Sequence, residues 1–588
     1  MTSILEILTQ TDNLFQEYPE LAALFSEYTY KRLQSRDPKQ PLRQLADIVD
    51  FKPMELACAA YHTLSGPGCN PTHTMPKMLR AVLVKYFYDY SLRAAEFNIR
   101  YNTLIKSFVD YAIYEEGPDH STISRFENYL ILHHPRLFFD TVLRQIDEAF
   151  PDDRLRPQIA DTFAVHADAA MESLTKRLRH GCQKLLVAFQ RENPVAYDQL
   201  WAQVDVDNIF GAEDEKIEYT ISIEQRQERL LRILNGIDSC LQLVKTDPVS
   251  AAVQKWVTVL EKLLSDELHL KRDEAGHILH AALLGKKKDE NKGGKKRGTY
   301  AIFSATDPDA TIRNHGEGKV DPGYNGSVTA TTEFIRDIRA DTGSQPDHVA
   351  IPDLLAAQME HHDLAPSKLI YDQEAGTGKA AYEAKAVTKG KTQLVVKPKA
   401  TKATNAETFG PTDFILSDDA LTLTCPNGRS TSRRYLSGSG DGFNFRIPKS
   451  KCAGCLLLQN CRGKEKWPHP PDPYVRPTTP RNVFISDYRI ERQELVAYSK
   501  TDAFKEDMKL RPEIERTISI LVQHNGARRA RFRGLEKVDF QLKMCGMAFN
   551  VKRWLAKLSG KRPAKRRRFS APQPSRRPFR GEVGLLTA

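Results

Sequence analysis

The feature that most constrains the fold is a carboxylate placed within an apolar strand. Residues 156–170, RPQIADTFAVHADAA, show the β-branched and aromatic alternation of a β-strand. On such a strand Ile159, Asp161, Phe163 and Val165 share one face. A carboxylate among apolar neighbours costs several kcal/mol unless a cation or a metal ion compensates it. The sequence therefore predicts a core strand in which Asp161 has a partner or a function.

A second strand ends in another carboxylate. In KLIYDQEAGTGK (368–379), apolar residues run directly into Asp372 and a glycine loop. AGTGK is similar to the end of a phosphate-binding loop, but Gln373 stands where the first glycine is needed and Ala380 where the hydroxyl is needed. Asp372 could be a functional carboxylate at the end of this strand. The alternative is that it only forms a turn or caps a helix.

A third carboxylate lies in residues 510–558. The apolar spacing predicts two helices around the basic turn ARRARFRG. Glu515 lies one step round from the first apolar stripe and could point along a sheet edge; a solvated surface glutamate is the alternative. Three carboxylates from separate elements, unaccompanied by histidine or cysteine, suit two Mg²⁺ ions acting on a phosphodiester better than a zinc hydrolase.

The remaining patterns predict one sheet with interruptions. Strand signals appear in GTYAIFSATD, GYNGSVTAT, KLIYD and TQLVVKPK, whereas residues 171–284 show helical periodicity, as in KWVTVLEKLLSDELHL. Four thiols, one pair of them in a CxxC motif, follow the last of these strands. Their spacing favours a tetrahedral zinc site over disulfides in a reducing compartment. They are Cys425, Cys452, Cys455 and Cys461.

The N-terminal part reads as helical. Residues 1–74 indicate short helices and loops, and a compact helical domain follows from Met75. In GPDHSTISRF, Asp119 or Ser121 can cap a helix whose first turns carry Arg125. A turn, a cap and a basic first turn are typical of a helix that reads DNA; a capped helix within a bundle is the alternative.

The net charge of +11 is concentrated in two runs. Residues 561–580 carry nine basic residues and no acidic one, and residues 285–297 carry seven basic against two acidic. Such runs suit phosphate backbones, or they serve as a solubilising tail and linker. Because no apolar run approaches ~18 residues and the start lacks the features of a signal peptide, we expect a cytoplasmic protein without a membrane span.

These stretches, in this order, resemble the DDE-type insertion-sequence transposases of bacteria over roughly residues 75–558. The matching blocks are IADTFAVHADAA, RGTYAIFSATDPDATIRNHGEGKVDPGYNGSVTA, LIYDQEAGTG, CPNG with the CxxC motif, and RPEIERTI followed by RARFRGLEKV. The resemblance implies a ribonuclease-H-like fold in which Asp161, Asp372 and Glu515 bind the metal ions. It also implies that Arg511 corresponds to the arginine that precedes the family's glutamate.

Two positions depart from the family pattern. Met508 stands where the family has a tyrosine, and Val522 where it has a lysine; both family residues are associated with DNA contact. Arg528 and Arg529 are the nearest basic substitutes. Two alternatives to an active transposase therefore stay open: a DNA-binding protein with an inactive core, and a metal-dependent nuclease that cuts without joining.

Together with this resemblance, which implies the ribonuclease-H-like sheet, the sequence predicts an α/β protein with a mixed sheet, a helical N-terminal domain, a helical insertion and a small zinc-knuckle insertion. The expected function is metal-dependent cleavage of element ends and joining of the 3′-hydroxyl to target DNA, by a homodimer bound to the terminal inverted repeats and associated with the nucleoid. The expected units are residues 1–74, 75–150 (helical, DNA-binding), 151–170 with 298–410 (core), 171–297 (helical insertion with basic linker), 411–480 (zinc insertion), 481–560 (catalytic helix) and 561–588 (basic disordered tail).

Overall fold

The computed structural model describes most of residues 19–560. It leaves out 37–39, 62–71, 213–214, 218–219, 246–248, 286, 293, 297, 299–300, 315–319, 400–407, 464–473 and 475–476. The basic tail (561–588) lies outside the described residues, and the basic run at 285–297 lies partly outside them. Within the described residues, none of the helices combines the length and the apolar character that a bilayer crossing requires.

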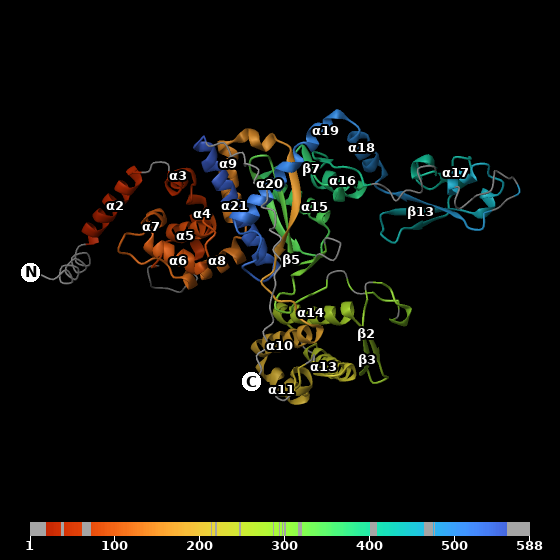
Figure 1. Ribbon diagram of the computed structural model, residues 1–588, viewed down its shortest axis with the longest axis horizontal. Coiled ribbons are helices and arrows are strands. Elements are labelled where there is room, and N and C mark those ends of the chain that lie inside the picture. Colours follow the sequence, from red (N-terminus) through yellow and green to blue (C-terminus); the bar gives the residue numbers. More distant parts are fainter. Residues whose placement is uncertain are drawn as a thin grey trace, which may run out of the picture.

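The N-terminal region is helical, as the sequence predicts (Figure 1). Its helices surround α5, whose residues are almost all buried, because apolar side chains recur on every face of that helix. The elements are α2 (Pro19–Arg36), α3 (Pro41–Ile48), α4 (Lys52–Ala57), η1 (Ala59–Tyr61), α5 (Met75–Phe87), α6 (Leu92–Tyr101), α7 (Thr103–Val109), α8 (His120–His133), α9 (Leu137–Ala149) and η3 (Pro151–Leu155).

A mixed sheet of six strands forms the centre of the molecule. Its main path runs β4-β5-β1-β7-β8, and β6 also pairs with β5. β1 is antiparallel to β5 and parallel to β7, and β7 is parallel to β8. The bounds are β1 (Gln158–His166), β4 (Thr311–Asn314), β5 (Val320–Ala330), β6 (Ile335–Thr342), β7 (Lys368–Ile370) and β8 (Gln393–Val395).

Alternate residues of the sheet enter different cores. Ile159 and Phe163 of β1 pack in the largest core cluster with α20 (Arg511–His524) and α21 (Leu535–Leu558). Ala160 instead packs in a second cluster with α15 (Ile351–His362), α16 (Gly378–Val387) and α18 (Arg489–Ser499). α19 (Asp502–Met508) completes the elements around the sheet. The predicted face of β1, with Ile159, Phe163 and Val165 together, is confirmed.

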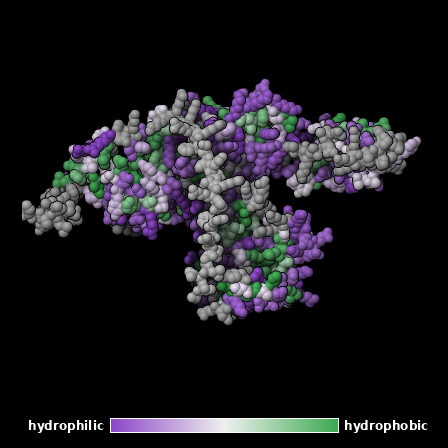
Figure 2. Space-filling model, in the orientation of Figure 1, coloured by the Kyte–Doolittle hydropathy of each residue, from purple (hydrophilic) through white to green (hydrophobic). Residues whose placement is uncertain are grey.

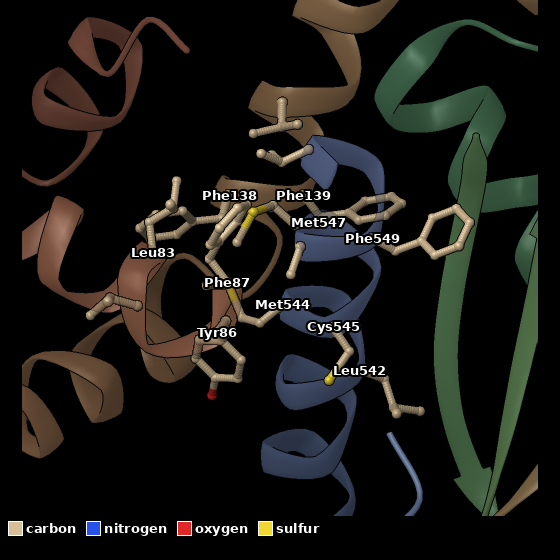
Figure 3. Close-up of a cluster of buried hydrophobic side chains, with 14 of the residues drawn as sticks. Leu83, Tyr86, Phe87, Phe138, Phe139, Leu542, Met544, Cys545, Met547 and Phe549 are labelled. Atoms are coloured by element: carbon tan, nitrogen blue, oxygen red, sulfur yellow. The ribbon is translucent and has the colours of Figure 1, made fainter. Parts of the chain in front are cut away.

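Helix α21 joins the N-terminal helices to the sheet. Its side chains meet Leu83 and Phe87 of α5 and Phe138 of α9, as Figure 3 shows, and they belong to the same core as β1. The helix also lies along β6, an edge strand of the sheet. Asn550 accepts from Ile335 N at 2.8 Å and donates to Ile335 O at 2.9 Å. Asn550 thus satisfies both backbone groups of Ile335, which an exposed edge would leave to water or to another chain.

Two insertions extend from this body. The first contains α10 (Leu174–Glu192), α11 (Pro194–Gln203), α12 (Val206–Phe210), α13 (Ile223–Val244) and α14 (Ala251–Glu267), and it has a core of its own. It ends in a hairpin of β2 (Leu268–Arg272) and β3 (Ile278–Leu283), followed by η5 (Glu290–Lys292). The second consists of small sheets with short helices: η8 (Pro411–Asp413), β9 (Ile415–Leu416), β10 (Leu423–Thr424), β11 (Ser430–Thr431), β12 (Arg434–Leu436), β13 (Gly442–Ile447), η9 (Lys449–Cys452), α17 (Leu458–Arg462) and β14 (Arg481–Ser486).

Two expectations from the sequence were wrong in detail. The helical pattern expected through Leu270 stops at Glu267, and the next residues pair as a hairpin, with Leu268 opposite Leu283. The segment expected as a strand at 298–307 makes one isolated bridge among its described residues, from Ile302 to Thr311. In both places the pairing formed in the folded chain decides the conformation, because a short apolar run suits either a strand or a packed irregular segment.

We expect Asn550→Ala to lower the free energy of unfolding by about 1–3 kcal/mol, because it leaves both buried backbone groups of Ile335 without partners. Denaturant titration followed by circular dichroism measures the change. Lys537→Ala, an exposed change on the same helix, is the control and should alter the unfolding free energy by less than about 0.5 kcal/mol. Equal effects of the two substitutions would contradict the role of Asn550.

Candidate active site

Asp161 and Asp372 lie at equivalent positions of neighbouring parallel strands. Ile159 of β1 pairs with Ile370 of β7, and both side chains belong to the same core cluster. On the other side of β7, the ladder with β8 continues one residue past the strand, where Tyr371 N donates to Val395 O at 3.0 Å, so the chain is still extended there. Two residues beyond the Ile159 and Ile370 pair, the same register and the same face lead to Asp161 and Asp372.

Asp161 is mostly buried and already has a cationic partner. Its side chain is 18% exposed. Oδ1 accepts from Thr162 N at 2.8 Å, and Oδ2 accepts from Arg511 Nη2 at 2.8 Å. Burial raises the pKa of the Asp161 carboxyl, and the nearby charge of Asp372 raises it further, while Arg511 opposes both effects. The strand thus carries a carboxylate whose desolvation is only partly compensated.

Asp372 also caps the turn that follows it. Its Oδ1 accepts from Glu374 N at 2.9 Å, at the start of η7 (Gln373–Ala375). The capping role considered from the sequence is therefore present. A cap uses one lone pair of one oxygen, so the carboxylate keeps capacity for a further partner.

Helix α20 brings Glu515 towards Asp161 through Arg511. Ile514, Thr517 and Leu521 are buried, which turns that face of the helix to the core. Glu515 lies off this face and its side chain is 69% exposed. Arg511 Nη1 lies 3.7 Å from Glu515 Oε1, while Nη2 of the same guanidinium binds Asp161. One cation therefore stands between these two carboxylates.

The three carboxylates are not assembled as a metal cage. Among the described residues, no group of three or more His, Cys, Asp or Glu side chains is arranged to hold a metal ion. Their oxygens are the hard ligands that Mg²⁺ prefers, so the donor chemistry fits. The arrangement differs from a cage because Arg511 occupies Oδ2 of Asp161.

Met508 and Val522, the two departures from the family pattern, have a structural role. Both side chains are partly buried and pack against the largest core cluster. A long polar side chain at either position would have to leave this apolar contact to reach solvent. The two departures are therefore compatible with a packed fold. Arg511, between them in the sequence, is a cation in the same region.

The predicted DNA-contacting arginines occupy different parts of the molecule. Arg125 is exposed on the first turns of α8, where Nη2 donates to Thr122 Oγ1 at 3.0 Å. Asp119 is the cap of that helix, and its hydrogen bonds, chiefly from Thr122 N, lower the pKa of the carboxyl to about 2. Arg528 and Arg529 are exposed beside the end of β1, where Arg528 Nη1 donates to Ala164 O at 3.2 Å.

A polar network beside the site was missed by sequence reasoning. Arg313 of β4 donates to Thr162 Oγ1 at 3.0 Å and to Asn325 Oδ1 at 2.9 Å, and it lies 3.1 Å from Asp347. Tyr371 OH donates to the carbonyl of Asp347. This network fixes the residues next to Asp161 and Asp372 from the other face of the sheet. No local pattern could reveal it, because its members come from five separate segments.

The four cysteines of the second insertion line one small hollow of about 20 Å³. Burial raises the pKa of the Cys452 thiol, and the neighbouring Cys425 and Cys455 thiols add to this effect. Burial also raises the pKa of the Cys461 thiol, and the neighbouring Cys452 and Cys455 thiols add to this effect. The structure places the four thiols around one hollow, but they too fall under the finding that no group of His, Cys, Asp or Glu among the described residues is arranged to hold a metal ion.

The surface nearest α18 and α19 is hydrophilic on the face drawn in Figure 2. Beneath it, Lys368 binds Asp507 at 2.8 Å, and Tyr498 OH donates to the same carboxylate at 2.6 Å. This group ties the start of β7 to α18 and α19. The segment that leads into Arg511 is thereby held beside β7, the strand that precedes Asp372.

Two family models match the chain. Residues 30–129 match a model described as Transposase domain (DUF772), which covers Arg125, and residues 424–555 match one described as Transposase DDE domain, which covers the four cysteines, Arg511 and Glu515. Asp161 and Asp372 lie outside both ranges. No curated protein and no solved structure matches the chain. The two matched transposase domains, in the order that the sequence analysis expects, support the assignment of the chain to the DDE-type transposases of insertion elements.

Proposed function

We propose that this transposase cleaves the ends of its element by metal-dependent phosphodiester hydrolysis and joins the freed 3′-hydroxyl to target DNA. The observation that carries the proposal is the register of β1 and β7, which aligns Asp161 with Asp372. Helix α20 adds Arg511 and Glu515 beside the first of these carboxylates. The alignment of the two aspartates, and the position of Arg511 between Asp161 and Glu515, support the assignment of these three acidic groups to one site.

The fold supports a ribonuclease-H-like core. Three antiparallel strands, β6, β5 and β1, continue into parallel β7 and β8, and helices cover both faces. The two insertions leave this sheet intact because each enters between consecutive elements of it. In this proposal the first insertion separates β1 from β4. The second separates β8 from the C-terminal helices, of which α20 carries Glu515.

Asp161, Asp372 and Glu515 would hold Mg²⁺, which in such sites activates the attacking hydroxyl and stabilises the leaving oxygen. Arg511 would determine whether Asp161 is free to bind a metal ion, because its guanidinium occupies Oδ2 of this carboxylate. A DNA phosphate offers the Arg511 guanidinium a second anion, and a phosphate that accepts the Nη2 hydrogen bond in place of the carboxylate would free Asp161 Oδ2. Substrate binding and release of the carboxylate are thereby coupled.

We assign the DNA contacts to Arg125, Arg511, Arg528 and Arg529. Arg125 lies on an exposed first helical turn, a position from which base edges are read. The other three surround the strand that carries Asp161. Because two element ends need two active sites, we propose a homodimer on paired terminal inverted repeats, acting on the nucleoid in the cytoplasm.

We also propose a structural zinc ion held by Cys425, Cys452, Cys455 and Cys461. The shared hollow and the mutual influence of the thiols support it. Four thiolates leave no open position for a substrate, so the ion would stabilise the insertion rather than take part in the reaction.

We expect Asp161→Asn, Asp372→Asn and Glu515→Gln each to abolish Mg²⁺-dependent cleavage of DNA carrying the element ends, and to leave DNA affinity within about threefold, since each change removes a charged oxygen at constant shape. Gel assays of cleavage and strand transfer, with anisotropy for affinity, measure both. Glu513→Gln, on the same helix as Glu515, is the control and should cleave as the wild type does.

Wild-type cleavage by any of the three variants would remove that residue from the site. Cleavage without strand transfer by the wild-type chain would favour a nuclease. Binding without either activity would favour an inactive DNA-binding protein.

The second prediction concerns Arg511. Arg511→Gln should reduce the slope of log affinity against log salt by roughly 0.9, the loss of one phosphate contact. Arg516→Gln is the matched control, because Arg516 lies on the same helix, is 69% exposed and pairs with Glu513. A slope for Arg511→Gln equal to that of the wild type would show that Arg511 serves Asp161 alone.

For the cysteine group we expect about one zinc ion per chain by elemental analysis, and a value near zero for Cys452→Ser. Cys240→Ser, in the core of the first insertion, should keep the wild-type zinc content. Wild-type protein without zinc, whose four thiols all react with an alkylating reagent, would refute the site.

A further inference from the structure

The sheet of β12, β13 and β14 has two unlike faces. One face is apolar and closed, with Phe445, Ile447, Val483 and Ile485 all buried in the core of the second insertion. The other face carries the alternating residues of the same strands, and most of these are exposed. A sheet in this setting usually has a polar outer face, but this outer face includes two large rings.

Two rows of side chains cross the outer face. In one row Tyr435 pairs with Asn444, which pairs with Phe484. Tyr435 is 55% exposed and Phe484 is 40% exposed. Because paired strands lie ~4.8 Å apart, the two rings stand roughly 10 Å from each other across the sheet, with the Asn444 amide between them.

The next row is basic. Arg446 N donates to Arg433 O at 2.8 Å, and Arg446 pairs with Asn482 on β14. Both arginines are exposed, and neither guanidinium has a hydrogen bond or an ion pair within the described part of the chain. Neither row contains a carboxylate. The nearby Asp441 is paired with Lys379 at 3.1 Å.

Exposed rings beside unpaired guanidinium groups suit one class of ligand. Aromatic side chains stack on the faces of bases, which are accessible only where bases are unpaired, and arginines bind the phosphates between them. Duplex DNA hides its base faces and would meet only the arginines. An amide between the two rings can bond the edges of either neighbouring base.

We propose that the outer face of the β12–β13–β14 sheet is a binding platform for an unpaired DNA strand, with Tyr435 and Phe484 as stacking residues and Arg433 and Arg446 as phosphate contacts. The proposal rests on the transposase function, because cleavage at an element end creates a strand end whose base pairs can open and leave the strand unpaired. The platform itself binds without any covalent step.

The platform is connected to the candidate active site. β14 continues into α18, and α18 packs on α16, the helix that follows Asp372. The rings of Tyr382 and Tyr488 lie 5.1 Å apart at this junction, and the Lys379 to Asp441 pair links α16 to the start of β13. In Figure 1 the sheet extends from the α16 and α18 side of the core, opposite the N-terminal helices. A DNA strand bound to the platform would therefore extend from the core on the same side as Asp372.

The test measures binding of the full-length chain, without added Mg²⁺, to fluorescent oligo-dT and to a duplex of random sequence. Tyr435→Ala and Phe484→Ala should each weaken oligo-dT binding at least about 5-fold, the change that corresponds to about 1 kcal/mol per stacked base. Duplex affinity should change less than twofold. Tyr435→Phe keeps the ring and should bind oligo-dT as the wild type does.

Two controls come from the same insertion. Ile415→Ala removes an apolar side chain that is 71% exposed on another sheet, and Lys449→Ala removes one exposed positive charge outside the two rows. Neither should affect the preference for oligo-dT over duplex. The double variant Arg433→Ala/Arg446→Ala removes two charges from the platform. The loss in the logarithm of its oligo-dT affinity should be more than twice the loss caused by Lys449→Ala.

Equal losses on oligo-dT and duplex, or no loss, would overturn the platform. So would a change from dimer to monomer in Tyr435→Ala with oligo-dT binding retained, since that result would make the face a contact between copies. Failure of the transposase function is separable, because it would appear as absence of cleavage and joining by the wild-type chain, whatever the ring variants do.

Discussion

Helix α21 is the element on which the arrangement of the rest depends. Its residues are buried over most of its length, including Lys543 and Asn550. Such a helix must give its polar groups partners, and it does so along β6. Lys543 donates to Ile338 O at 3.0 Å, and Asp539 accepts from Ala340 N at 2.9 Å. Side chains of a helix thus satisfy the backbone of an edge strand, while apolar neighbours on the same helix hold the N-terminal helices.

Buried ion pairs reinforce this junction. Arg336 of β6 has no exposed side-chain surface and binds both Asp147 and Asp153, from the α9 and η3 region. Arg136, just before α9, lies 3.1 Å from Asp337 of β6. Removal of one partner would leave a buried charge uncompensated, which costs about 3–5 kcal/mol. The helices that present Arg125 are therefore fixed relative to the sheet that carries Asp161, and in the proposed mechanism this spacing relates DNA reading to cleavage.

In the candidate site, by contrast, a buried charge is only partly compensated. Asp161 is held in a position where burial opposes its charge, and a single guanidinium offsets part of that cost. A site built in this way is poised for a stronger cation, because a partly compensated carboxylate gains more from a new partner than a fully paired one does. In the proposed mechanism a phosphate draws Arg511 away from Asp161, so the same contact would serve the resting state and substrate entry.

The sequence alone determined the strand that contains Asp161, the strand end at Asp372, the two C-terminal helices and the grouping of four cysteines, because each follows from local periodicity or spacing. It did not predict the hairpin after Glu267, the loss of a strand at 298–307, or strands β4 and β6, because each of these short segments takes its conformation from the partner it meets in the folded chain, even where that partner is near in sequence. Nor could it show that Arg511 binds Asp161 across 350 residues, or that Asn550 caps β6. Local patterns fix which face of an element is apolar, but tertiary structure decides which polar group meets which, because such partners are selected by proximity in the folded chain.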